Sequence, residues 1–299
     1  MGGANFPDPS VIRVADGWHA FSTNAVVNGK LVHVQNGYTP DYNTWTLRSG
    51  VDAMPDLAPW VYAGSPRVWA PDVIQLPDGS FLMYYTAAYK KMSNLHCLGW
   101  AKSRYVDGPY IDTSATPWIC PTAQGGAIDP AGYLNSDGTR WVVYKIDGNA
   151  SGHGGSCGNT VAPIVQTPIM LQQVNAADGH TLIGDPIQLI TNGPADGPYV
   201  EAPSLSYLGG KYVLFFSSQC YQTPQYDVSY ATAPSITGPY TKYGPLLVTG
   251  SNGMTAPGGL DLAINGNHAI WHANYGSGRA AFTGFVALSG NIVTASTFS

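Results

Sequence analysis

The sequence predicts an all-β fold, and three observations lead to this prediction. One hairpin pattern occurs five times along the 299 residues. The chain contains 36 Gly and 23 Pro residues, which favour tight turns over long helices. Long stretches with the period of an amphipathic helix are absent from the sequence. We therefore expect many short strands joined by tight turns.

Each copy of the hairpin pattern begins with a small or acidic residue beside Pro or Gly. An apolar strand follows, then a glycine turn and a second strand rich in aromatic residues. The copies begin at Asp8, Ala70, Asp129, Glu201 and Gly258. Their turn dipeptides are Asp16-Gly17, Asp78-Gly79, Asp137-Gly138, Gly209-Gly210 and Asn265-Gly266. Such dipeptides supply the positive φ angles of tight hairpins, so five hairpins are predicted.

The spacing of the copies leaves room for further strands in each repeat. Residues 98–102 and 228–233 both alternate apolar and polar residues. The similar segments Asp107-Gly108-Pro109-Tyr110 and Thr237-Gly238-Pro239-Tyr240 follow them, so a third-to-fourth strand connection also recurs. Four antiparallel strands per repeat predict a five-bladed β-propeller in which residues 1–299 form a single domain. A β-sandwich lacks this periodicity, and a parallel β-helix has shorter repeats.

Composition and charge exclude several classes of partner. Only 10% of the residues are charged, the net charge is −5, and no basic cluster is longer than Lys90-Lys91, so we expect neither nucleic acid nor a membrane as partner. The four cysteines form no CxxC motif and predict two disulfides, with four buried free thiols as the alternative. Together with the glycosylation sequon Asn149-Ala150-Ser151, they favour a secreted protein. We expect it to be a monomer.

Three acidic residues provide the main indication of chemistry. Asp8, Asp129 and Glu201 begin three of the five repeats in a chain with only 18 acidic residues. The innermost strands of a propeller line its axis, so we expect the three carboxyl groups to converge. Two carboxyls suffice for hydrolysis of a glycosidic bond, and a third nearby raises the pKa of the acid. The alternatives are turn formation by Asp-Pro and a calcium site.

Aromatic residues next to these acids are candidates for binding a sugar. Phe6 precedes Asp8, Trp69 opens the second repeat, and Tyr199 precedes Glu201. For each of the three aromatic residues, packing between blades is the alternative.

Four short motifs occur along the chain in the order Asp8-Pro9, Trp69-Ala70-Pro71-Asp72, Ile128-Asp129-Pro130 and Glu201-Ala202-Pro203. Together they resemble the motifs of glycoside hydrolase family 43. The resemblance implies a five-bladed catalytic propeller that needs no cofactor and inverts the anomeric centre. It also implies that Asp8 is the general base, that Asp129 modulates pKa values and orients groups, and that Glu201 is the general acid. We leave Asp72 outside the catalytic set, because it could equally accept backbone hydrogen bonds.

The fifth repeat departs from the family pattern. Many members carry a Gly-His pair whose His binds a calcium ion in the channel, whereas this sequence reads Ala256-Pro257-Gly258-Gly259. A channel calcium held by His268 or His272 is therefore left open, with packing as the alternative for each. His272 and Arg279 resemble residues that bind sugar in relatives, and a surface charge is the alternative for Arg279.

The substrates implied by the resemblance are plant cell-wall polysaccharides or oligosaccharides. Our first hypothesis is an α-L-arabinofuranosidase that acts on arabinan or arabinose-decorated hemicellulose. An endo-1,5-α-L-arabinanase and a β-D-xylosidase are the alternatives within the family. A carbohydrate-binding propeller without catalysis and a calcium-stabilised scaffold are the alternatives outside it. The Gly- and Ser-rich loop 148–160 is expected to border one end of the site, and exo or endo action stays open.

Overall fold

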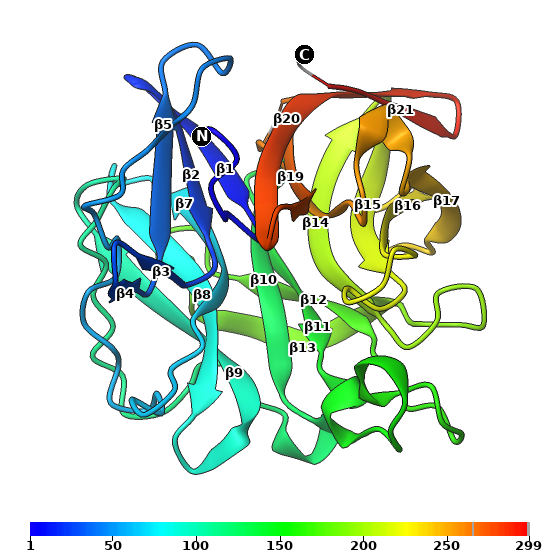
Figure 1. Ribbon diagram of the computed structural model, residues 1–299, viewed down its shortest axis with the longest axis horizontal. Coiled ribbons are helices and arrows are strands. Elements are labelled where there is room, and N and C mark those ends of the chain that lie inside the picture. Colours follow the sequence, from blue (N-terminus) through cyan, green and yellow to red (C-terminus); the bar gives the residue numbers. More distant parts are fainter. Residues whose placement is uncertain (265, 298–299) are drawn as a thin grey trace.

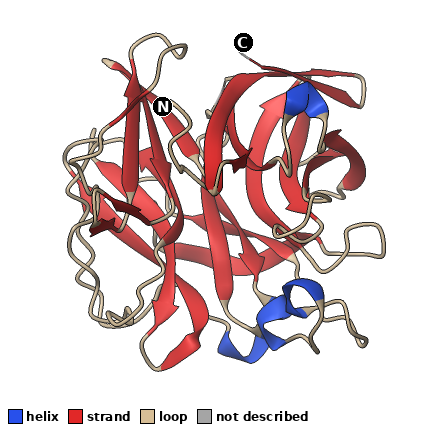
Figure 2. Cartoon of the chain, in the orientation of Figure 1, coloured by secondary structure: helices blue, strands red, loops and turns tan. Residues whose placement is uncertain are grey.

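The computed structural model describes residues 1–264 and 266–297. Five antiparallel sheets follow one another around a common axis, from blue at the N-terminus to red at the C-terminus (Figure 1). Within the described residues, helix is limited to 3-10 turns of three or four residues, and strands and loops make up the rest (Figure 2). None of these helical segments is long and apolar enough to cross a membrane. The predicted five-bladed propeller is thus confirmed.

The blades take their strands from the chain in sequence order. Blade one contains β1 (Ser10–Val14), β2 (Gly17–Ser22), β5 (Gln35–Thr39) and β6 (Thr46–Leu47), with β3 (Ala25–Val27) and β4 (Lys30–Val32) as a separate hairpin. Blade two contains β7 (Trp69–Gln75), β8 (Phe81–Tyr89) and β9 (Met92–Ser103). Blade three contains β10 (Ala127–Leu134), β11 (Arg140–Ile146), β12 (Ile169–Val174) and β13 (Leu182–Ile190). Blade four contains β14 (Val200–Leu208), β15 (Lys211–Ser218), β16 (Asp227–Ala233) and β17 (Thr241–Leu247). Blade five contains β18 (Gly258–Leu262), β19 (His268–Tyr275), β20 (Gly278–Ser289) and β21 (Ile292–Thr297).

The five predicted hairpins are the first two strands of each blade. They pair as β1–β2, β7–β8, β10–β11, β14–β15 and β18–β19. Asn265 of the predicted fifth turn lies outside the described residues. The predicted strands 98–102 and 228–233 lie in β9 and β16. In the connection after each of them, a tyrosine hydroxyl donates to the carbonyl four residues earlier, Tyr110 to Val106 and Tyr240 to Ile236.

Blade two differs from the predicted four strands. In place of a fourth strand, the described residues form isolated bridges to β9, two of them through Ile111 and Ile119. Between these bridges the carboxylate of Asp112 accepts hydrogen bonds from the Tyr85 hydroxyl (2.7 Å) and the Trp60 indole (3.3 Å). Because a buried carboxylate needs such donors, the chain turns inward there and leaves the ladder.

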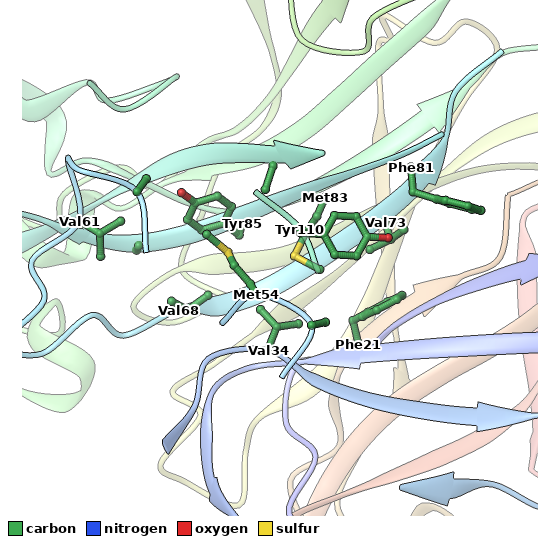
Figure 3. Close-up of a cluster of buried hydrophobic side chains, with 14 of the residues drawn as sticks. Phe21, Val34, Met54, Val61, Val68, Val73, Phe81, Met83, Tyr85 and Tyr110 are labelled. Carbon is green, nitrogen blue, oxygen red and sulfur yellow. The ribbon is translucent and has the colours of Figure 1, made fainter. Parts of the chain in front are cut away.

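Apolar side chains fill the wedges between neighbouring blades. Figure 3 shows the cluster between blades one and two, where Phe21 of β2 lies near Val73 of β7 and Met83 of β8. A similar cluster joins blades four and five around the fully buried Trp271. The ring closes where Asn5 bridges to Ala280 of β20. Large aromatic and aliphatic side chains thus hold the blades in fixed relative positions.

Every blade begins its inner strand with one residue in the left-handed region. These residues are Asp8 (φ 50°), Ala70 (41°), Asp129 (55°), Ala202 (49°) and Gly259 (58°). Pro follows the first four of them, at a point where the ladder is interrupted and needs no N–H donor. Asp8 and Asp129 are therefore equivalent, but Glu201 lies one residue before its blade's equivalent, Ala202. The prediction of three matching positions is wrong for Glu201, because the shared Pro and not the acid marks the register.

The backbone N–H of each left-handed residue donates a hydrogen bond at the blade boundary. The pairs are Ala70 with Thr23 Oγ1 (2.9 Å), Asp129 with Thr86 Oγ1 (3.0 Å), Ala202 with Asp129 Oδ2 (3.0 Å), Gly259 with Ser217 Oγ (2.9 Å) and Asp8 with His272 Nδ1 (3.0 Å). We call this set the axial ring. It fixes the positions from which the acidic side chains project.

Candidate active site

A cavity of about 490 Å³ lies where the inner strands begin. The three predicted carboxyl groups, of Asp8, Asp129 and Glu201, all line it. Of the predicted sugar-binding residues, Trp69, Tyr199 and Arg279 also line it. Further lining residues include Thr23, His96, Lys145, Asp147, Asn149, Cys157, Tyr221 and Tyr226.

Asp8 is held as a carboxylate by three groups. Its Oδ1 accepts from Arg279 Nη1 (3.0 Å), its Oδ2 accepts from the Thr23 hydroxyl (2.7 Å), and His272 lies on its backbone side. Burial acts to raise the pKa of Asp8, but the charge of Arg279 and the Thr23 hydrogen bond lower it below its ordinary value. Asp8 is thus charged at neutral pH and suited to accept a proton.

The pKa of Asp129 is shifted upward, in the opposite direction from that of Asp8. Burial, followed by the negative charge of Glu201, raises the pKa of Asp129 to about 8. The Asp129 carboxyl accepts one hydrogen bond, from the Ala202 N–H. Because the carboxyls of Asp129 and Glu201 interact, one proton is retained by the pair at neutral pH.

Glu201 has a donor on each carboxylate oxygen. Lys145 Nζ lies 3.1 Å from Oε2, and the Tyr226 hydroxyl donates to Oε1 at 2.9 Å. Lys145 also pairs with Asp147 Oδ1 at 3.2 Å. The sequence analysis missed Lys145, Asp147 and Tyr226. A signal for the first two was present, because two charges two residues apart interrupt the apolar end of β11.

Three predicted sugar-binding residues line the cavity, of which Tyr199 is fully buried. The ring of Trp69 stacks on His96 with centroids 4.0 Å apart. The Tyr199 hydroxyl accepts the backbone N–H of Tyr221 (2.8 Å). The Arg279 guanidinium lies 5.6 Å from the centroid of the Tyr221 ring. The partly exposed Trp69 ring and the Arg279 guanidinium are therefore the groups best suited to bind a sugar.

The structure places Phe6 and His272 behind the cavity wall. Phe6 is fully buried in the apolar cluster that contains Trp18 and Tyr42. His272 is also fully buried, and its Nε2 lies 3.3 Å from Arg279 Nη1. Burial and the charge of Arg279 lower the pKa of His272 to about 3, so its ring is neutral. His272 therefore contacts Asp8 and Arg279 instead of the cavity.

The residues of this chain do not fit a calcium ion bound through histidine. Both ring nitrogens of His272 already face other groups, Asp8 N–H and Arg279. His268 packs against the Trp18 ring with centroids 4.4 Å apart. Gly259 lies in the stretch where many family members carry the Gly-His pair. Here any side chain at Gly259 would place its Cβ 2.9 Å from the His272 ring. Among the described residues, no group of three or more His, Cys, Asp or Glu side chains is arranged to hold a metal.

The central channel below the cavity is narrow and contains two further carboxyls, of Asp72 and Asp261. Asp72 Oδ2 accepts the Gly132 N–H (2.6 Å) of the next blade, which fits its interpretation as a structural acceptor. Asp261 accepts the Val11 N–H (2.8 Å) and the Ser204 hydroxyl (2.8 Å). Burial raises the pKa of Asp261 to about 6, and burial with the charge of Asp261 raises that of Asp72 to about 8. Through these hydrogen bonds the carboxyls of Asp72 and Asp261 link neighbouring blades.

The two predicted disulfides are present, as Cys97–Cys120 and Cys157–Cys220. The second bond joins loop 148–160 to the chain segment that follows β15. Both segments contribute to the cavity wall, the first through Asn149 and the second through Tyr221. The loop thus borders the cavity, as its position in the sequence led us to expect.

Solved structures share this fold. A thermostable family-43 glycoside hydrolase superposes with a TM-score of 0.79 at 21% identity, covering 99% of this chain and 94% of that chain. The GH43 endo-arabinanase from Bacillus licheniformis superposes with a TM-score of 0.71 at 23% identity, covering 98% of each chain.

Similar sequences have related names. Extracellular endo-α-(1→5)-L-arabinanase 1 of Bacillus subtilis is 26% identical over 282 residues, or 89% of this chain and 79% of that protein. β-D-galactofuranosidase xynD of Aspergillus niger is 26% identical over 252 residues, or 79% of this chain and 64% of that protein. The sequence profile of Glycosyl hydrolases family 43 matches residues 3–282. Because this match spans nearly all of the chain, the protein belongs to glycosyl hydrolase family 43.

Proposed function

We propose that this glycoside hydrolase cleaves α-L-arabinofuranosyl linkages of arabinan with inversion. The observation that carries the proposal is the split ionisation of the cavity: Asp8 is a carboxylate, while Asp129 and Glu201 together retain a proton. Such a pair of environments separates a base from an acid. Asp8 comes from blade one and Glu201 from blade four, which are not neighbours, and an inverting enzyme needs a wide gap of about 6.5–9.5 Å between its carboxyls.

The proposed reaction is a single displacement. Asp8 accepts a proton from water as the water oxygen attacks the anomeric carbon, and Arg279 and Thr23 hold the carboxylate in place. Glu201 donates its proton to the leaving glycosidic oxygen as the C–O bond breaks. Asp129 shares this retained proton with Glu201, and its carboxyl orients the Ala202 backbone by accepting the Ala202 N–H.

The substrate class follows from the wall of the cavity and from the relatives. Trp69 offers a partly exposed ring to a neutral sugar, while Arg279 and Lys145 are each engaged with a carboxylate. The endo-arabinanase names favour internal cleavage over the release of terminal residues that the sequence analysis placed first. Release of single arabinose units and β-xylosidase activity are the competing outcomes.

We further propose that residues 1–299 act as one catalytic unit, as a monomer, outside the cell. Two disulfides favour an oxidising compartment. Two of the similar Bacillus subtilis proteins are named as extracellular.

The test compares Glu201→Gln and Asp8→Asn with the wild type on linear α-1,5-arabinan. Each substitution should lower kcat about 10²–10⁴-fold, because each removes a proton-transfer group, while the circular dichroism spectrum stays unchanged. Asp137→Asn, in an exposed hairpin turn, is the matched control and should keep full activity. Product sizes separate internal cleavage from release of arabinose, and NMR should detect the β-anomer first.

Turnover at the wild-type rate by either variant refutes the assignment of these roles. Binding of arabinan in calorimetry without any product, even after long incubation of the wild type, would instead show a carbohydrate-binding propeller.

A further inference from the structure

The axial ring provides a way to compare the five blades position by position. Its acceptors in blades one, two, four and five are Thr23, Thr86, Ser217 and His272. In blades two, four and five the acceptor occupies the same position in the strand register. It pairs across the ladder with the residue just before the left-handed one. The pairs are Trp69 with Thr86, Glu201 with Ser217 and Gly258 with His272.

In blade three this position is occupied by Lys145, which pairs with Ile128. An ammonium group has three donors and no acceptor, so it cannot receive the N–H of the next blade. The Ala202 N–H donates to the Asp129 carboxyl instead. Blade three thus lacks the hydroxyl or imidazole acceptor of the other blades, and a carboxyl of the cavity replaces it.

The side chain of Lys145 extends into the acidic part of the cavity. Its side chain is 1% exposed, and its Nζ lies 3.1 Å from Glu201 Oε2 and 3.2 Å from Asp147 Oδ1. The Nζ also lies 4.3 Å from the centroid of the Tyr199 ring. A buried charge costs free energy unless it is paired. Pairing with Asp147 alone would satisfy a structural lysine, so the contact with Glu201 needs a separate explanation.

We propose that Lys145 is a positioning residue that fixes the carboxyl of Glu201 toward the leaving oxygen of the substrate. Lys145 and Tyr226 hold one oxygen each, so the carboxyl cannot rotate freely between them. The inference rests on the proposed function, because it assigns a support to the proposed general acid. It goes beyond that function in assigning a role to the one acceptor position of the ring that carries a cation.

The charge of Lys145 also affects how the acidic pair binds its proton. A cation within about 4–6 Å favours the deprotonated form. Without that cation, the pair should hold its proton to higher pH, which moves the alkaline limb of the kcat/KM profile upward by about one unit or more. The other titratable or charged groups that surround the pair are Asp8, Asp147, Tyr199, Tyr221, Tyr226 and Arg279.

The experiment compares Lys145→Met with the wild type on two substrates that differ in their need for acid catalysis. An arabino-oligosaccharide has a poor leaving group, whereas a 4-nitrophenyl arabinofuranoside has a good one. Loss of a correctly placed acid should lower kcat about 10²-fold on the oligosaccharide and only a few-fold on the aryl glycoside. Glu201→Gln provides the reference pattern. Equal losses on both substrates, with the alkaline limb unmoved, would show a structural role and overturn the inference.

Further variants distinguish the effect of the Lys145 charge on catalysis from an effect on folding. Lys145→Arg retains a cation and should keep the alkaline limb near its wild-type position. Lys145→Thr restores the hydroxyl of the other blades, so it should fold at least as well as Lys145→Met but show the same kinetic defect. Ser217→Ala removes a ring acceptor without changing charge, and it should lower the Tm while leaving the alkaline limb in place. Full oligosaccharide activity of Lys145→Thr refutes the inference.

The outcomes also separate this inference from the proposed function. If the wild type releases no product from either substrate, the proposed function fails and the positioning role fails with it. If the wild type is active and Lys145→Met behaves identically on both substrates, only the positioning role fails.

Discussion

The buried carboxyl of Asp72 should make the stability of the propeller depend on pH. Burial, and then the charge of Asp261, raise the pKa of Asp72 to about 8 from an ordinary value of 3.8, while the backbone hydrogen bonds from Gly132 and Val73, and then Arg140, act in the opposite direction. An acid with a raised pKa binds its proton more tightly in the folded chain than in the unfolded chain. Its contribution to stability is therefore complete below pH 3.8 and is lost as the pH rises toward 8.

The size of the effect follows from this difference in proton binding. Each pH unit between the unfolded pKa and the working pH costs the fold about 1.4 kcal/mol while the folded group stays protonated. At pH 7 Asp72 therefore costs up to about 4 kcal/mol. Asn keeps a carbonyl oxygen for the Gly132 N–H but does not ionise. Asp72→Asn should thus resemble the wild type at pH 4 and exceed its free energy of unfolding by up to about 4 kcal/mol at pH 7.

Urea unfolding followed by tryptophan fluorescence, repeated at each pH from 4 to 8, measures this difference directly. Asp137→Asn is the control, because Asp137 is exposed and its hydrogen bonds with Thr139 lower its pKa, so any small effect has the opposite sign. A Asp72→Asn variant that unfolds at a constant offset from the wild type across the whole range would refute the reasoning. Such a result would mean that Asp72 is charged in the folded channel.

Two further predictions concern the cavity wall. Replacing Cys157 and Cys220 by Ala should lower the free energy of unfolding by about 2–4 kcal/mol, since the bond spans 63 residues, and should raise KM for arabinan because both joined segments line the cavity. Calorimetry and steady-state kinetics measure the two effects, and an unchanged KM would show that the wall keeps its shape without the bond. Trp69→Ala should raise KM for arabino-oligosaccharides about tenfold with little change in kcat; a loss confined to kcat would contradict sugar stacking on Trp69.

Hairpins were predictable because their signals are local. A turn dipeptide with positive φ angles and the strands on either side of it lie within a short stretch of chain. The missing fourth strand of blade two was not predictable in this way, because it depends on hydrogen bonds of Asp112 with Tyr85 and Trp60, which lie far from it in the sequence. Local patterns specify which segments can pair, and buried polar contacts decide where pairing stops.

The same limit explains the mixed placement of the aromatic candidates. Phe6 and Tyr199 each lie two residues before an acid of the cavity, yet Phe6 packs in the core and Tyr199 lines the cavity. The offsets differ in structural terms, because Asp8 is the left-handed residue of its blade whereas Glu201 precedes Ala202. A shift of one residue reverses the side of a strand on which a side chain lies. Sequence proximity to an acid therefore does not by itself predict contact with the substrate.

The residues at the equivalent positions of the axial ring differ between blades in a way that indicates the active site. Three of its second-strand positions carry hydroxyl residues, Thr23, Thr86 and Ser217, each of which accepts a backbone N–H, and Thr23 also donates to the Asp8 carboxylate. Lys145 and His272 are the two positions without a hydroxyl, and Lys145 pairs with the carboxyl of Glu201 while His272 accepts the Asp8 N–H. A repeat constrains every blade to the same backbone hydrogen bonds, so a residue that breaks the pattern must be supported by some other interaction. In blade three, where Lys145 cannot accept the N–H, that interaction is with Glu201 and Asp147, so this departure from the ring points to the site independently of the repeated acids.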